Sequence, residues 1–135
     1  MNPTARHSSR SMWPFHAGAA ADVAVGAGLL ALAPQIATLI LPMHAEVAGL
    51  ATAAILRGLG VFLILFALET VVVAKARGML SRFRSWVVAA NWATVALVTF
   101  VLVTAGSAFS AIGVAAVAVV GVFVAGITAL QQKAI

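Results

Sequence analysis

Long apolar runs alternate with short polar segments along the chain, and this alternation predicts its elements. The apolar runs cover about residues 18–41, 47–74, 86–105 and 109–130. Each reaches the roughly 20 residues that a helix needs to cross the hydrocarbon core of a bilayer. The pattern therefore predicts an all-α fold, a bundle of four transmembrane helices in a single integral membrane domain over residues 1–135.

The first apolar run follows a polar, basic segment, residues 1–16, as it would in a signal peptide. Ala31–Ala33 resembles a cleavage site, but Pro34 would follow the cut and the run continues to Leu41. We therefore expect a retained cytoplasmic tail and a first span. Pro34 should kink the outer third of that span, because proline has no backbone N–H. Small residues recur at four-residue spacing in this span, which allows helix backbones to approach closely; they are Gly18, Ala20, Ala24, Gly26 and Gly28.

The basic segment Lys75–Trp86 separates the second and third spans, and its residues 75–85 are expected to form a cytoplasmic loop. Met79, Leu80 and Phe83 interleave with cations there. Such a segment can lie at the membrane interface and attract anionic lipid headgroups. The cations that would contact headgroups are Lys75, Arg77, Arg82 and Arg84. The alternative is a solvated loop that only orients the helices.

The other cations agree with an orientation in which both termini are cytoplasmic. Arg6 and Arg10 lie in the N-terminal tail and Lys133 near the C-terminus, while the remaining two turns carry no Lys or Arg. Loops rich in Lys and Arg stay in the cytoplasm, and tryptophans collect at the membrane interface. Trp13, Trp86 and Trp92 all fall near that same face. The positive-inside pattern predicts a multi-pass protein of a bacterial cytoplasmic (inner) membrane.

The amino-acid composition excludes a soluble fold. Hydrophobic residues make up 64% and charged residues 8% of the chain, against about 45–50% and about 25% in ordinary soluble domains. The net charge of +5 does not indicate nucleic-acid binding, because the basic residues lie at the ends of apolar runs. The chain has no cysteine, which excludes disulfides and thiolate metal sites.

Charged side chains inside the predicted spans require an explanation. Inserting one at mid-bilayer costs a free energy of about 2.5–3.5 kcal/mol on the insertion scale. Arg57 would lie ~27 Å from Lys75 at ~1.5 Å per residue. It can snorkel to the periplasmic surface, where Glu46 is a neighbour, or bind a ligand there. Glu69 would lie only ~9 Å inside the cytoplasmic boundary.

Asn91 and Asp22 are expected at a similar depth to Glu69, on the third and first spans. We hypothesise that Asp22, Glu69 and Asn91 face each other, with Thr70 and Thr94 nearby, as a proton- or cation-linked site. The alternatives are that these groups only join helices by hydrogen bonds, or that Glu69 pairs with Lys75 or Arg77.

No arrangement typical of an enzyme is found in the sequence. His7, His16 and His44 are the histidines, and no two lie at one depth on facing helices where they could hold a haem. A histidine metal cluster, a Ser–His–acid arrangement and a phosphate-binding glycine motif are likewise not indicated. We therefore expect no enzymatic activity, no cofactor and no metal.

Several features between residues 50 and 105 resemble the layout of small bacterial integral membrane proteins with four helices, a group without a known activity. These features are Leu56–Gly60, Phe66-Ala67, the basic segment and Asn91-Trp92. The small multidrug exporters are similar in length and helix count. Their essential glutamate lies in the first span, whereas this chain has Asp22 there and Glu69 in the second.

The expected function is that of a non-enzymatic accessory or scaffolding subunit, which contacts other membrane helices and anionic lipid. It would act as a homo-oligomer or in a larger membrane complex, without nucleic acid. The alternative is a small proton-coupled transporter or ligand-binding bundle that uses Glu69.

Overall fold

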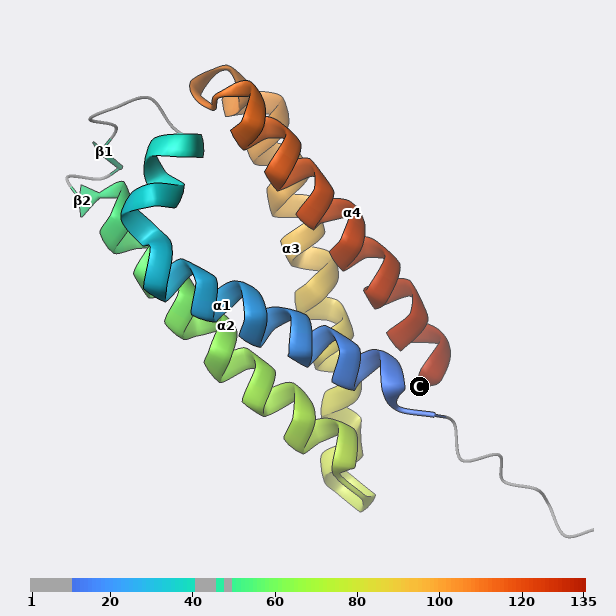
Figure 1. Ribbon diagram of the computed structural model, residues 1–135. Coiled ribbons are helices and arrows are strands. Elements are labelled where there is room, and N and C mark those ends of the chain that lie inside the picture. The colour runs from blue at the N-terminus through green and yellow to red at the C-terminus, as the bar shows by residue number, and fades with distance from the viewer. Residues whose placement is uncertain (1–10, 41–45, 48–49) are drawn as a thin grey trace, which may run out of the picture.

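The computed structural model describes residues 11–40, 46–47 and 50–135, and Figure 1 shows its ribbon. Its helices are α1 (Trp13–Ile40), α2 (Thr52–Lys75), α3 (Phe83–Ala105) and α4 (Ala111–Ala134). Each of these four is long and apolar enough to cross a membrane. The prediction of a helical chain with four candidate spans is confirmed over the described residues.

The short elements between the helices correct the predicted boundaries. Strands β1 (Glu46–Val47) and β2 (Leu50–Ala51) pair antiparallel, with Glu46 opposite Ala51. The second helix therefore begins at Thr52 rather than at residue 47. At 28 residues α1 is longer than the 24-residue α2, whereas the predicted second span, residues 47–74, is longer than the predicted first, residues 18–41.

Both chain-terminal helices extend further than predicted. α1 begins at Trp13, since Pro14 in a first turn removes only an N–H that has no partner inside the helix. α4 continues to Ala134, where Gln131 and Gln132 make hydrogen bonds to α3. Between the helices lie the 3₁₀ turns η1 (Gly78–Arg82) and η2 (Gly106–Ala108).

The predicted kink in α1 is present. Leu32 leaves helical geometry, at φ −120° and ψ 20°, two residues before Pro34. Proline at this position removes the hydrogen bond to the carbonyl four residues earlier and clashes with it. The bent outer part of α1 then turns away from its first course, as Figure 1 shows in cyan.

The start of α1, the end of α2 and the start of α3 meet at one end of the molecule. Phe15 packs there with side chains of the other two helices, and Ala134 of α4 packs against the same cluster. The partners of Phe15 in this cluster are Val73, Ala74, Val87 and Val88. The four helices therefore run alternately up and down. The start of α1 and the end of α4 lie at the same end of the molecule as η1 (Figure 1).

Glycines set the close contacts of α1 with its neighbours. A Cβ on Gly26 would lie 2.8 Å from the carbonyl oxygen of Gly60, and a Cβ on Gly60 would lie 2.7 Å from that of Gly26. A Cβ on Gly113 would lie 2.5 Å from the carbonyl oxygen of Ile40. Gly26 and Gly60 bring α1 onto α2, and Gly113 brings α4 onto the last residue of α1.

Candidate functional site: the basic end of the bundle

The basic segment is a compact turn between α2 and α3. α2 ends at Lys75, Ala76 is extended, and Gly78 adopts φ +65°, a left-handed conformation that favours glycine. The hydroxyl of Ser81 donates to the carbonyl of Gly78 at 2.7 Å. The 3₁₀ turn η1 then leads directly into α3 at Phe83.

Arg84 is bonded to the end of α2. Its Nη2 donates to the carbonyl oxygens of Ala74 at 3.0 Å and Ala76 at 2.8 Å, and its Nε donates to Val73 O at 3.3 Å. The last carbonyls of a helix lack partners inside the helix and carry partial negative charge, so a cation stabilises them. Among the cations predicted to contact headgroups, Arg84 is therefore already bonded to protein.

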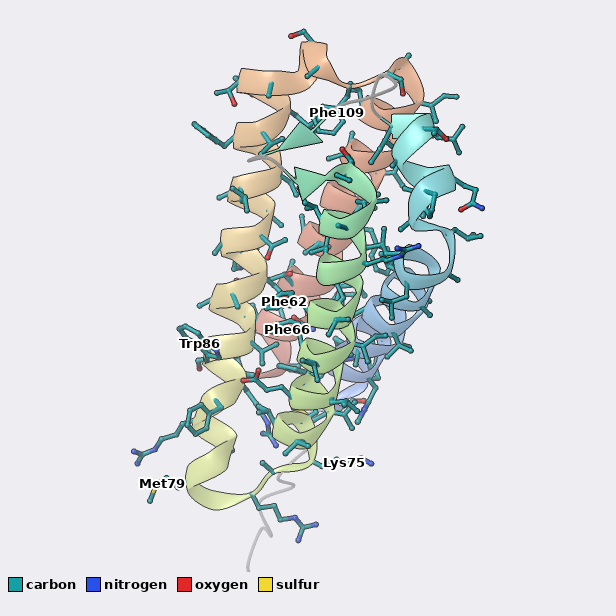
Figure 2. All side chains as sticks on the ribbon, turned by 90° about the vertical axis from the view of Figure 1, so that its left-hand side faces the viewer. Phe62, Phe66, Lys75, Met79, Trp86 and Phe109 are labelled. Atoms are coloured by element: carbon teal, nitrogen blue, oxygen red, sulfur yellow. The ribbon has the colours of Figure 1, made fainter. Side chains whose placement is uncertain are left out.

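Lys75, Arg77 and Arg82 are exposed around this turn. Met79, Phe83 and Trp86 are exposed beside them. Figure 2 shows Lys75 and Met79 at the basic end of the bundle, with Trp86 further along α3. Cationic and large apolar side chains thus lie side by side at one end of the molecule.

The three residues of the hypothesised polar cluster differ in exposure and come from three helices. Glu69 is exposed on α2, whereas Asp22 on α1 and Asn91 on α3 are each half-buried. Asn91 donates its Nδ2 to Gln131 Oε1 of α4 at 2.8 Å. Within the described part of the chain, no hydrogen bond or ion pair joins Asp22, Glu69 and Asn91 to one another.

Gln131 is a buried polar residue that the sequence pattern did not predict as part of the site. Its side chain is 1% exposed, it accepts from Asn91, and its Nε2 donates to the carbonyl oxygen of Pro14 at 3.4 Å. A Cβ on Gly18 would lie 2.9 Å from this Nε2, so glycine there leaves room for the amide. The apolar pattern predicts that the last span ends at Leu130, so it leaves Gln131 outside the span. The only signal in the sequence is that Gln131 is an amide that could pair with the amide of Asn91 on another helix.

The remaining predicted residues are more scattered. Arg57 is exposed near the start of α2. The side chain of Glu46, and the whole of His7 and His44, lie outside the described residues, while His16 is exposed on α1. Thr94 donates to the carbonyl of Ala90 in its own helix.

Thr70 differs from Thr94, because its buried hydroxyl has no hydrogen-bond partner among the described residues. Most other helical threonines bond a carbonyl three or four residues earlier, as Thr38 and Thr128 do. The group predicted near Glu69 therefore points into the bundle while Glu69 does not.

Comparison with models of known protein families gave no match, and comparisons with curated proteins and with solved structures gave none either. The resemblance of residues 50–105 to small four-helix membrane proteins thus rests on the sequence pattern alone.

Proposed function

We propose that this chain is a non-enzymatic accessory or scaffolding subunit of a bacterial inner membrane, with both termini in the cytoplasm. It contacts other membrane helices through its outer helix faces and anionic lipid through its basic end. The helices α1–α4 are each long and apolar enough to cross a membrane, which supports four crossings of the bilayer.

The exposed cations of the basic end are the observation that carries this proposal. Lys75, Arg77 and Arg82 surround a turn whose geometry is fixed by Gly78 and by the bonds of Arg84 to α2. A juxtamembrane cation contributes about 1 kcal/mol of attraction to an anionic membrane surface. The exposed Met79, Phe83 and Trp86 can enter the headgroup region beside them.

The outer surfaces of the helices support the second half of the proposal. Large apolar side chains are exposed on every helix, for example Leu32, Phe62, Phe100 and Val122. Lipid or other membrane helices must cover such surfaces. The transporter alternative has less support, because Glu69 is exposed while Asn91 bonds Gln131.

Fluorescence quenching tests the lipid contact. A single-tryptophan protein, Trp13→Phe with Trp92→Phe, leaves Trp86 as the reporter in bilayers that contain brominated phosphatidylglycerol or brominated phosphatidylcholine. We expect the anionic lipid to quench Trp86 more strongly, and the preference to be lost in Lys75→Gln/Arg77→Gln/Arg82→Gln. Arg57→Gln, at the opposite end of α2, is the matched control and should keep the preference. Equal quenching by both lipids in the parent protein would contradict the proposed lipid contact.

Purification tests the accessory role. The tagged chain, extracted from its native membrane in a mild detergent, should elute in a complex that contains other membrane chains. Elution of the 13.7 kDa chain without another protein species would contradict an accessory role.

A further inference from the structure

Asp22 lies in the middle of the buried face of α1 and is itself half-buried. Its neighbours one turn away contact different helices, since Gly18 lies against Gln131 of α4 and Gly26 lies against Gly60 of α2. At about 100° per residue, Asp22 lies about 40° from each of these two glycines around the helix. Its carboxyl group therefore points between α4 and α2, into the bundle. The buried residues that share this face are Phe15, Ala19, Gly26, Leu29 and Ala33.

Thr70 of α2 points into the same interior. Its side chain is 1% exposed, and its hydroxyl has no hydrogen-bond partner among the described residues. Val73 packs with α3 and Gly60 contacts α1. Thr70 lies about 60° from Val73 and about 80° from Gly60 around the helix, on the side between them. A buried hydroxyl without a partner is costly, so this position calls for a ligand that supplies one.

Asp22 and Thr70 lie about one helical turn apart along the bundle. The helices α1 and α2 are antiparallel, and a Cβ on Gly26 would lie close to both Gly60 and Leu63. Counted from these contacts, Thr70 lies ~4.5–9 Å nearer the basic end than Asp22, at ~1.5 Å per residue. Each Cα–Cβ bond is tilted toward the N-terminus of its helix, so the two side chains lean toward each other. This separation suits one small ligand between the carboxyl and hydroxyl groups.

Asn91 of α3 adds a third oxygen to this interior. Its Nδ2 donates to Gln131 at 2.8 Å, while its Oδ1 makes no hydrogen bond among the described residues. The contact of Gln131 with Gly18 places this amide pair within about one turn of Asp22 along α1. Three helices thus contribute a carboxylate, a hydroxyl and an amide oxygen.

No cationic side chain of the described residues balances the charge of Asp22. Arg84 is bonded to the end of α2. The other described Lys, Arg and His side chains are exposed, and they are His16, Arg57, Lys75, Arg77, Arg82 and Lys133. A carboxylate within a membrane bundle requires a partner, because its charge is costly there.

We propose that the bundle binds a small monovalent cation, such as Na⁺, between Asp22, Thr70 and Asn91. Oxygen atoms of these kinds are the ligands that hard cations prefer. The hydroxyl oxygen of Thr70 has lone pairs for the cation, and its O–H can donate to the carboxylate. A water molecule alone would give Thr70 a partner but would leave the carboxylate charge uncompensated. The site offers a single carboxylate, so one positive charge matches it.

Thermal unfolding in phosphatidylcholine nanodiscs tests this cation site, which depends on the proposed function only in placing α1–α4 in a bilayer. Na⁺ is the probe, compared with N-methyl-D-glucamine at equal ionic strength. A ligand that binds the folded state stabilises it by mass action, so we expect a Tm several degrees higher in Na⁺, with a saturable dependence on its concentration. The fluorescence of Trp92, next to Asn91, reports the transition.

Substitutions assign the effect to the proposed ligands. Asp22→Asn should abolish the Na⁺ dependence of the Tm. Thr70→Val should weaken this dependence and raise the Tm in the absence of Na⁺, because it removes an unpaired buried hydroxyl, whereas Thr70→Ser should keep the dependence. Glu69→Gln is the matched control, since it removes an exposed carboxylate of α2, and it should behave as the parent protein does.

The same Tm of the parent protein in Na⁺ and in N-methyl-D-glucamine would overturn the proposal and leave water or a proton as the partner of Asp22. An Na⁺ dependence that survives in Asp22→Asn, or that is lost in Glu69→Gln, would also overturn it. The quenching of Trp86 by anionic lipid is measured separately, so failure of the cation site and failure of the lipid contact are distinguishable.

Discussion

The amide of Gln131 stabilises the basic end of the bundle through its contacts with two other helices. Its Oε1 accepts from Asn91 at 2.8 Å, and its side chain is almost fully buried. Replacing one partner by leucine leaves the other amide unpaired, which costs more than the pair contributes. Hydrogen bonds between membrane helices contribute about 0.6 kcal/mol on average and at most about 1.7 kcal/mol.

We therefore expect a double-mutant cycle of Asn91→Leu and Gln131→Leu to give a coupling free energy of about 0.6–1.7 kcal/mol. The free energy of unfolding in mixed detergent micelles is the measurement. The exposed pair Trp92–Gln132, with Nε1 to Oε1 at 3.1 Å, is the control and should give a smaller coupling. Coupling no larger for the buried pair than for the exposed one would show that Gln131 does not hold Asn91 in the membrane-like environment.

The partner of Asn91 illustrates what the sequence can and cannot predict at the scale of a residue. Counting from the span ends places Glu69 and Asn91 at a similar depth, since the rise per residue is fixed at about 1.5 Å. Depth does not determine rotation about the helix axis. The close contact of Gly60 with Gly26 turns one face of α2 towards α1. In this rotation of the helix, Glu69 is exposed.

At the scale of the element, Arg84 joins two helices by capping one with a side chain from the next. Its Nη2 and Nε donate to carbonyls in the last turn of α2 and just beyond it. Arg82 is a matched control, since it is a nearby exposed arginine that makes no hydrogen bond to α2 among the described residues. Hydrogen bonds to charged groups contribute about 1.5–3 kcal/mol.

We expect Arg84→Gln to speed amide hydrogen exchange in the last turns of α2 by about tenfold or more, since every 1.4 kcal/mol is about tenfold. Arg82→Gln should leave that exchange unchanged and weaken only the lipid preference of Trp86. Mass spectrometry of peptides that cover residues 68–77 reports the rates. Similar exchange in the two variants would mean that the cap does not hold the helix end.

Element boundaries were predictable where a residue dictates them. Pro34 predicts the kink, and the structure has it at Leu32. The start of the second span has no such marker, because apolar residues from Val47 onwards continue its run, yet Glu46–Val47 and Leu50–Ala51 pair as β1 and β2. The extension of α4 to Ala134 depends on partners of Gln131 and Gln132 in α3, which spacing alone does not reveal.

At the scale of the whole molecule, α1 contacts both its neighbour α2 and the start of α4. It packs on α2 through Gly26 and Gly60, and its last residue accepts a hydrogen bond from Ser110 N at 3.0 Å, at the start of α4. The hydroxyl of Ser110 also donates to Leu39 O and accepts from Gly113 N. α1 therefore contacts α2 near its middle and the start of α4 at its last residue.

The distribution of cations over the two ends of this arrangement should decide its orientation in the membrane. Lys75, Arg77, Arg82 and Lys133 lie on the described part of the basic end, whereas η2 at the other end, Gly106–Ala108, contains no charge. Because Lys and Arg near span ends stay on the cytoplasmic side, a reporter fused after Ile135 should be active in the cytoplasm and not outside it.

Moving the positive charge to the other end of the bundle, by Lys75→Gln/Arg77→Gln/Arg82→Gln together with lysine at positions 106–108, should export the reporter in a large fraction of molecules. The same three lysines without the glutamine changes are the control and should give a smaller exported fraction. An exported reporter in the unmodified chain would show that the orientation is opposite to the predicted one. The basic end would then face away from the anionic lipid of the cytoplasmic leaflet.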